Sequence, residues 1–528
     1  MADVTVAASP PETINVRRFV AFIAMIAGMF MAVLSVQIVG SSFKEIQAAL
    51  GAAPDEVSWV LTAALIAEVI MIPLSARFSQ ICSTRIFFTI CAGGFTLASV
   101  GCAQAWDVPS MIAFRATQGF FGGGMMPMVV ASLYTAIPRR LQVTFAMIFG
   151  MLGTSAVAIG PVVGGWITEV LSWEWLFLVN VPIGVVVVVV VGLLVDFDRP
   201  DVRLIRQTDF AGIVLAFLLL GSTLFVLQEG QRRDWFESSL ILGCTVVAGI
   251  TLVAFLVREF TAREPLVRFG TFRRSHFLVG VLLIGVFGGG LYVPIYLLPL
   301  YLGQVRGFDT ATIGSITAVL GVSMVLSGVF AGHLVRYIGL GWTAALGFGL
   351  LAAGTILHAG LTIDSGFAEW ALPQVLRGMG APLAYFTMLD LSMSALPVSE
   401  VKHGSALFNL IMRLGAAVGL AIANTLLVAR ADLHYARIAE SMSLPPGGGW
   451  QVLGLVSGLL AGTLSPEVHA DAVGYLTQIA QREALIMAFN DVLIGNACHR
   501  QTPGHTADRR GRNRGWPRVR RGRGVDRR

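Results

Sequence analysis

Charged side chains are scarce in this chain. Asp, Glu, Lys and Arg make up 13% of its 528 residues, whereas 55% of the residues are hydrophobic. Soluble domains carry charge on about a quarter of their residues, and the mean hydropathy of +0.75 lies far outside their range. The alternating segments of about ten residues that build a transmembrane β-barrel do not occur either. The composition therefore predicts a polytopic, all-helical membrane protein.

The residues that carry enzymatic chemistry do not cluster in the sequence. The five cysteines lack metal-ligand spacing, and their odd number argues against a disulfide framework. His, Cys and carboxylate groups do not recur at useful spacing, which argues against a membrane-embedded enzyme. We expect no metal, no cofactor and no enzymatic activity.

Apolar runs recur along the chain at the length that a helix needs to cross about 30 Å of hydrocarbon. A shorter run at Ala484–Ala497 is a weaker, fourteenth candidate. The predicted spans are Phe19–Val39, Val57–Ser75, Ile86–Gln104, Pro109–Ala136, Val143–Val170, Trp175–Val195, Phe210–Leu227, Leu240–Val257, Phe277–Leu302, Ile313–Val335, Gly341–Ile363, Ala368–Leu396 and Ser405–Ala429.

Arginines are concentrated in alternate loops between these spans, and the intervening loops carry mainly acidic residues. Because Lys and Arg in short loops stay on the cytoplasmic side, this alternation predicts a cytoplasmic amino terminus. No small-residue cleavage site follows the first span, so we expect a retained helix and not a signal peptide.

Two sequence patterns each occur twice at the same separation. Arg115 and Arg377 lie in similar small-residue surroundings, as do Gly153 and Gly415, and the members of each pair are 262 positions apart. One shift for two landmarks indicates duplicated halves. The fold expected is two pseudo-symmetric six-helix bundles plus two extra helices. The expected divisions are 1–200 for the first bundle, 201–262 for the extra helices, 263–429 for the second bundle, 430–482 for an extracytoplasmic loop, and 483–528 for a degenerate last helix and an Arg-rich disordered tail.

Glycine and proline are unusually dense in the fifth span. Gly153, Ala156, Gly160 and Gly164 fall on one helical face, which lets a neighbouring helix pack at short distance. Pro161 cannot donate a backbone hydrogen bond, so the helix should bend there. We interpret this face as a seam along which two bundles separate and reclose; the alternative is ordinary tight packing.

The same residues resemble a known family. GPVVGGW at 160–166, which includes Gly165, with SWEWLFLVNVPIG after it, looks like the fifth-helix antiporter motif of the major facilitator superfamily, in its fourteen-span drug:proton antiporter branch (EmrB/QacA type). FRATQGFFGGG at 114–124, which includes Gln118 and Gly119, is similar to the fourth-helix motif of that branch. ALFNLIMRLGAAVGLAIA at 406–423 resembles its thirteenth span.

The resemblance implies alternating access, with export driven by inward proton flow and with the fourth-helix arginine, here Arg115, implicated in proton coupling. Two departures bear on the mechanism. Ser35 stands where the family usually has an Asp in the first span, and SARFSQICSTR after the second span lacks the glycines and the acid of the usual loop motif. These departures put the usual proton site and the usual cytoplasmic latch in doubt.

Ionisable groups inside a span are functional candidates because an unpaired buried charge is costly. Glu68, in the middle of the second span, is our first choice as proton carrier, and the alternative is a fixed partner to an arginine. Arg115 would modulate a nearby acid or hold a polar network. Asp390 is the second carboxylate candidate, with Arg377 and Arg413 as its expected partners in the second half.

The substrate cavity should be lined by facing helices of both halves. Gln37, Tyr292 and Tyr296 offer polar handles on otherwise apolar walls, which suit lipophilic or amphipathic compounds. The alternative for the two tyrosines is a role as interfacial anchors.

The end of the chain changes character. An outward loop at 430–482 with an interfacial helix is expected, and in the resembled branch such loops face a periplasmic adaptor, which is a possible partner. The Arg-rich run after Asn490 should be disordered; we interpret it as a shifted reading frame, and a lipid-attracted cytoplasmic tail is the alternative.

Taken as a whole, the sequence predicts a proton-coupled multidrug exporter in a bacterial inner membrane, with protons and lipophilic small molecules as its ligands and no nucleic-acid partner. The alternatives are an exporter of one endogenous metabolite, such as a siderophore or a fatty acid, and a channel.

Overall fold

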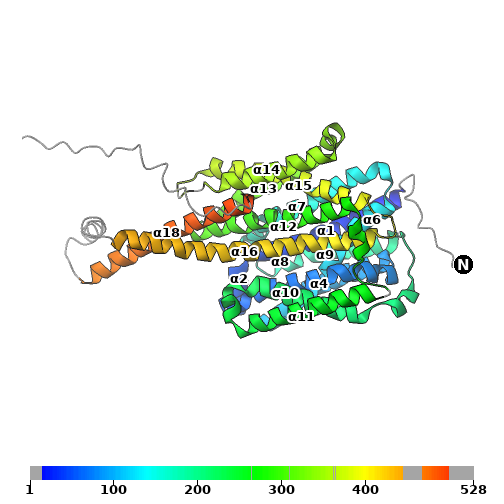
Figure 1. Ribbon diagram of the computed structural model, residues 1–528, viewed down its shortest axis with the longest axis horizontal. Helices are drawn as coiled ribbons and strands as arrows, with labels where there is room; N and C mark the ends of the chain where they lie inside the picture. Colours follow the sequence, from blue (N-terminus) through cyan, green and yellow to red (C-terminus); the bar gives the residue numbers. More distant parts are fainter. Residues whose placement is uncertain are drawn as a thin grey trace, which may run out of the picture.

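The structure is a computed structural model, and it describes residues 15–262, 264–308, 310–360, 362, 364–443 and 466–498. Within these residues the regular structure is helical (Figure 1). The long helices are α1 (Val16–Ser41), α4 (Trp59–Cys82), α5 (Thr84–Ala103), α6 (Val108–Ala136), α7 (Arg139–Val170), α9 (Asn180–Leu194), α10 (Phe210–Glu229), α11 (Ser239–Thr261), α12 (Ser275–Gln304), α13 (Thr310–Ile338), α14 (Leu340–His358), α15 (Phe367–Ser394), α16 (Val401–Ser443) and α18 (Pro466–Cys498). The shorter ones include α2 (Phe43–Leu50), α3 (Pro54–Val57), α8 (Trp175–Leu178) and a 3-10 turn, η1 (Val202–Gln207).

Each of the thirteen predicted spans coincides with a helix, so the predicted all-α fold is confirmed. The sixth span is divided between α8 and α9, with Pro182 in the first turn of α9, where its missing N–H is tolerated. Among the described residues, ten helical segments are long and apolar enough to cross a membrane. Neither α6, α7 nor α15 is among these ten. These three helices hold Arg115, Pro161 and Arg377, and their polar residues, glycines and prolines lower their hydropathy.

The two halves meet along two helix pairs. In the first pair, α7 lies against α13; in the second, α16 lies against α4 and α6. The 262-residue repeat relates α4 to α13 and α7 to α16. It therefore relates the pair of α4 and α16 to the pair of α13 and α7, and the contact has the approximate two-fold relation that the repeat predicts. The additional helices α10 and α11 pack on each other at one flank, and α10 touches both α4 and α16 (Figure 1).

Glycines bring particular helix pairs into backbone contact. A Cβ added to Gly119 or Gly123 of α6 would lie 2.1 Å from the Ala64 oxygen or 2.2 Å from the Glu68 oxygen of α4. In the second half, a Cβ on Gly415 of α16 would lie 2.0 Å from the Gly285 oxygen of α12. No side chain fits at these crossings. These close crossings fix the positions of α4 and α16 along their axes, and with them the positions of the charged residues on these two helices.

The small-residue face of α7 packs on α1 of its own half. A Cβ on Gly160 would lie 2.3 Å from Gln37 Cβ, and Ser42 Oγ donates a hydrogen bond to the Gly164 oxygen at 3.3 Å. The helix continues through Pro161. Other residues of α7 form the contact with the second half: a Cβ on Gly328 of α13 would lie 2.5 Å from Met151 Cβ. The fifth span, α7, therefore does line the contact between the two halves. Most of its glycine face, however, is directed away from that contact.

The last two described helices form an antiparallel hairpin that projects beyond the bundle (Figure 1). The 43 residues of α16 span about 65 Å at 1.5 Å per residue, about twice the hydrocarbon thickness. The helix thus continues through Ser443, where a loop was expected after Ala429, because the run RADLHYARIAESMS contains neither glycine nor proline. His434 and Arg430 both contact Asp491 of α18, at 2.9 and 3.8 Å.

The expected Arg-rich disordered tail and its interpretation as a shifted reading frame concern residues 499–528, which lie outside the described residues. The same holds for positions 444–465 of the expected outer loop.

Candidate functional site

The centre of the seam holds an ion pair between the two halves. Glu68 of α4 and Arg413 of α16 meet with Oε1 and Nη2 2.5 Å apart, and both residues are 8% exposed. Each charge alone would be costly in the membrane interior, so each depends on the other half for its partner. Separation of the halves at this level requires the pair to break.

Tyr292 of α12 supports the arginine. Arg413 Nη1 donates to the Tyr292 hydroxyl at 3.1 Å, and its guanidinium lies 5.8 Å from the centre of the tyrosine ring. The same tyrosine packs in a small apolar cluster with Val33 of α1 and Ala156 of α7. Tyr292 therefore touches both halves, whereas Tyr296, one turn further along, is 43% exposed and hydrogen-bonds to Asn424 of its own half.

The predicted arginine of the fourth span organises the first half beside Glu68. Arg115 Nε donates to the Val60 oxygen of α4 at 3.2 Å, and Nη1 donates to Gln118 Oε1 at 2.5 Å. Gln118 Nε2 in turn donates to Ser99 Oγ of α5 at 2.6 Å. Arg115 is thus fixed by three helices and by the ring of Phe177, 5.8 Å from its guanidinium carbon.

A small cavity of about 10 Å³ separates the arginine from the ion pair. Three buried polar atoms on residues that line it make no hydrogen bond to any described residue, namely Ser35 Oγ, Glu68 Oε2 and Arg115 Nη2. A cavity of this size is about what one water molecule needs. The two oxygens of Glu68 therefore differ: Oε1 is bound to the second half, and Oε2 has no hydrogen-bond partner among the described residues.

The expected partners of Asp390 are not found. Arg413 pairs with Glu68, and Arg377 contacts Gln374 within α15. Asp390 instead accepts a hydrogen bond from the Tyr134 hydroxyl of α6 at 3.3 Å, which is a second polar contact between the halves. Asp390 lies four residues from the end of α15, towards the arginine-rich loops, and so not beside either arginine.

At the end of the bundle that carries the arginine-rich loops, the start of α16 docks on the first half. Lys402 Nζ lies 2.5 Å from Asp198 Oδ2 and donates to the Ser79 oxygen at 3.3 Å. His403 Nε2 lies 3.1 Å from Gln80 Nε2. Asp198 is held in turn by Thr84, whose backbone N–H and hydroxyl donate to it. We call the contacts of Lys402 and His403 with the first half the loop-side lock.

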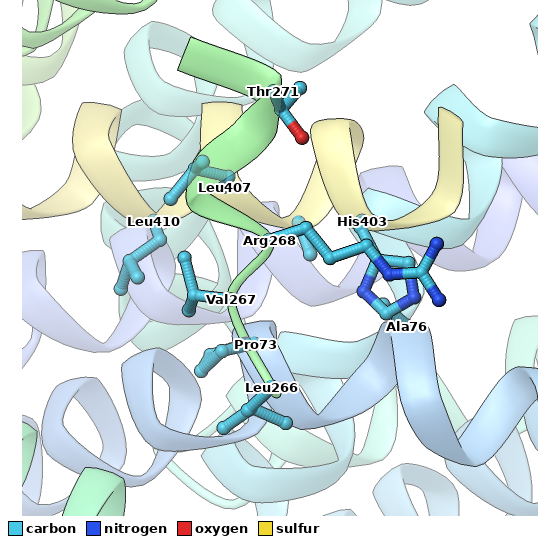
Figure 2. Close-up of a pocket in the computed structure, with 10 residues that line it drawn as sticks. Pro73, Ala76, Leu266, Val267, Arg268, Thr271, His403, Leu407 and Leu410 are labelled. Carbon is cyan, nitrogen blue, oxygen red and sulfur yellow. The ribbon is translucent and has the colours of Figure 1, made fainter. Parts of the chain in front are cut away.

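The linker between α11 and α12 reinforces the loop-side lock. Figure 2 shows residues 266–271 passing between α4 and α16, with Leu266 beside Pro73. Glu264 of this linker lies 3.8 Å from Arg77 of α4, whose Nε also donates to Thr208 at 3.2 Å. The usual acid of the loop after the second span is absent from this sequence, and Glu264 supplies a carboxylate to Arg77 from elsewhere.

Loosening the loop-side lock should open this end without abolishing transport. The pair of Lys402 and Asp198 is partly exposed, and such pairs contribute at most about 1 kcal/mol, or about fivefold in an equilibrium. We expect Lys402→Met to raise maleimide labelling of a single retained cysteine, Cys82, by up to about fivefold. Lys402→Arg keeps the charge and serves as the control. Equal labelling of both variants and the parent would contradict a role for the pair.

Sequence reasoning found the two charges of the central pair but not the loop-side lock. Lys402, His403 and Asp198 lie at helix ends, where charged residues are expected for topology alone, so no sequence signal distinguishes them. Gln37 is half-buried, and its Cβ contacts Gly160, which makes it a packing residue at the crossing of α1 with α7.

The comparisons with known proteins agree with this arrangement. The family model described as Major Facilitator Superfamily matches residues 25–420. The chain belongs to the major facilitator superfamily. This superfamily member is 37% identical over 422 residues to the colistin resistance protein EmrB of Acinetobacter baumannii, and the match covers 80% of this chain and 82% of that protein.

Other relatives are similar over the same region. The superfamily member is 26% identical to the multidrug export protein EmrB of Escherichia coli over 472 residues, covering 89% and 91% of the two chains. It is 26% identical to the fatty acid resistance protein FarB of Neisseria gonorrhoeae over 416 residues, covering 79% and 82%. The resemblance to the drug:proton antiporter branch is thus confirmed.

A solved structure shows the same fold. The human organic anion transporter MFSD10 aligns with a TM-score of 0.54 at 13% identity, over 78% of this chain and 93% of that one. This likeness shows the fold alone. The family match and the named relatives show that the superfamily member is a multi-pass membrane transporter and not an enzyme.

Proposed function

We propose that this transporter exports lipophilic or amphipathic small molecules across a bacterial inner membrane in exchange for protons, with its amino terminus in the cytoplasm. The observation that supports this most directly is the buried pair of Glu68 and Arg413, which links the two halves through a group that can bind a proton. A proton on Glu68 removes its charge, and the link is then weakened. Proton binding and the separation of α4 from α16 are coupled by this step.

The proton reaches Glu68 from the cavity and not from the arginine. Oε1 is held by Arg413, whereas Oε2 has no hydrogen-bond partner among the described residues, and Glu68 lines the cavity together with Ser35 and Arg115. Ser35 stands at the position where the family usually has an Asp. A serine hydroxyl does not titrate, so Ser35 can form hydrogen bonds in the cavity but cannot carry the proton. Arg115 stays charged throughout, because a guanidinium does not lose its proton.

The decisive experiment is transport in inverted membrane vesicles that contain this protein. Fluorescent lipophilic dyes should be moved when a proton gradient is present, and the movement should stop when the gradient is collapsed. Dye addition should also release protons from energised vesicles. Dye movement that is independent of the gradient would overturn proton coupling, and a flux that does not saturate would favour a channel.

Replacing Glu68 or Arg413 should lower the stability of the protein by different amounts. Glu68→Met leaves Arg413 charged, because a guanidinium does not lose its proton, whereas Arg413→Met leaves an acid that can become neutral. We expect Glu68→Met to lower stability by about 3–5 kcal/mol, Arg413→Met by less, and the double variant to recover part of the loss. Thermal unfolding in detergent measures this order, and equal losses for both single variants would contradict it.

We also propose that the projecting hairpin of α16 and α18 binds a periplasmic adaptor protein. Its length beyond the bundle supports this role, as does the pairing of Asp491 with Arg430 and His434, which ties the two helices together. Cross-linking from the exposed positions of α16 beyond residue 429 to a co-expressed adaptor tests it. Adaptor binding that survives disruption of the hairpin would remove it from this role.

A second candidate function is export of one fatty acid-like metabolite. The similarity to FarB, a protein named for fatty acid resistance, favours it. Resistance profiles of expressing and deletion strains separate the two: protection against many unrelated lipophilic compounds supports multidrug export, and protection against fatty acids alone supports the metabolite exporter.

A further inference from the structure

The second half contains an arginine with no carboxylate to balance it. Arg377 of α15 is 2% exposed, and its Nη2 donates to Gln374 of the same helix. Its Nε and Nη1 make no hydrogen bond to any described residue. Neither α13 nor α14, which enclose it, contains an Asp or a Glu. The two acids of α15, Glu369 and Asp390, lie at opposite ends of that helix, eight and thirteen positions away.

The equivalent arginine of the first half is better satisfied. Arg115 donates to a backbone oxygen of α4 as well as to Gln118, and Glu68 lies across the small cavity from it. The internal repeat therefore places two arginines in corresponding positions, but only the first has an acid nearby. A buried cation without a counter-charge is unstable in a membrane interior, so the second arginine calls for a negative partner that the described chain does not provide.

One further donor lies on the same face of α15 as Arg377. Trp370, two turns earlier, has an indole N–H without a partner among the described residues. His358 of α14 is 1% exposed, contacts the backbone of Trp370 and lies near the charge of Arg377. Because one ring nitrogen donates to that backbone carbonyl, the other is an acceptor in the neutral imidazole, and His358 packs beside the two donors without adding a third. The three side chains are brought together by close helix packing, since a Cβ on Gly354 of α14 would lie 2.6 Å from Arg377 Cγ.

We propose that Arg377 and Trp370, beside His358, form a binding site for a small inorganic anion, with chloride as the occupant. The guanidinium and the indole N–H can each donate a hydrogen bond, and the guanidinium supplies the charge that an anion requires. Burial favours a small, monovalent anion over a phosphate or a sulfate, whose larger charge is harder to bring out of water. The bound anion is the missing counter-charge of the second bundle, and it holds α14 on α15.

The test is the thermal stability of the purified, full-length protein in detergent, with sodium chloride exchanged for sodium gluconate at constant ionic strength. We expect a saturable rise of the melting temperature with chloride, on the order of a few degrees, and the same rise with bromide. Arg377→Gln should abolish the rise. Arg85→Gln, which removes an exposed arginine at the start of α5, should keep it in full.

Two results would overturn the proposal. A melting temperature of the parent protein that does not depend on chloride would mean that water satisfies these donors, and an undiminished rise in Arg377→Gln would mean that chloride binds elsewhere. Should Arg377→Gln fail to fold, Trp370→Phe decides: it keeps the aromatic packing and removes one donor. We expect its chloride midpoint to move several-fold higher, and an unchanged midpoint would contradict the site. The assay involves no transport, so its outcome is independent of proton coupling.

Discussion

Glu68→Gln should abolish efflux that is driven by a pH gradient. The amide is close in size to the acid and is permanently uncharged, so it reproduces the protonated state and cannot change between states. In the structure, the charge of Glu68 is what binds Arg413 of the second half at 2.5 Å. The variant should still bind substrate and still equilibrate it down its own concentration gradient. Gradient-driven dye efflux should fall by at least about a hundredfold, the lower end of the range for the loss of a proton-transferring group.

The matched control is Glu229→Gln. Glu229 is also a buried glutamate with an arginine partner, Arg232, and it accepts a hydrogen bond from Thr62. It lies at the end of α10, and its partner belongs to the same segment of the chain. We expect this variant to retain gradient-driven efflux. Unchanged transport in Glu68→Gln would remove Glu68 from the mechanism, and loss of transport in both variants would mean that only stability had been affected.

Gly123→Ala should displace the carboxylate without changing it. A methyl group at this position would lie 2.2 Å from the backbone oxygen of Glu68, so α4 and α6 must move apart. Overpacking of this kind costs about 1–3 kcal/mol, and a shift of about 1 Å at the reacting group can cost about a hundredfold in rate. We expect folded protein at reduced yield, with efflux lowered by ten- to a hundredfold, as judged by dye transport per folded molecule.

A glycine in open surroundings provides the comparison. Gly290 of α12 has no atom within 4 Å of an added Cβ, whereas Gly288, two residues earlier, would meet the Met412 oxygen at 2.3 Å. Gly290→Ala should change neither the yield of folded protein nor the rate of dye transport. Gly288→Ala should lower both, as Gly123→Ala does. If all three variants were alike, the close helix crossings would not control the position of the charged pair.

Much of this arrangement follows from the sequence alone. The spans, the two bundles and the inserted helix pair follow from hydropathy and from the 262-residue repeat. Glu68, Arg115 and Arg413 stand out because ionisable groups are rare inside spans. The pairing of Glu68 with Arg413 did not follow from the sequence, and Arg413 was expected opposite Asp390. Periodicity within one helix does not indicate which face of that helix meets the other half.

The remaining differences have local physical causes. The glycines of α7 indicated a close crossing, and the sequence could not tell that the partner is α1 and not α13. The extension of α16 to Ser443 could have been predicted from the sequence, since residues 430–443 contain neither glycine nor proline. The cavity beside Ser35 is lined by residues of four helices, α1, α4, α5 and α6. A single sequence carries no record of such a void.

The position of α10 makes the two sides of the molecule unequal towards lipid. This helix contacts both α4 and α16, so it covers one groove between the bundles on its membrane-facing side. On the opposite side, α7 and α13 meet with apolar side chains such as Val322 and Leu326 of α13 exposed. The additional helices α10 and α11 make no extensive contact with that pair. A lipophilic compound dissolved in the bilayer can therefore reach the contact of α7 with α13 directly, whereas α10 separates the contact of α4 with α16 from the lipid.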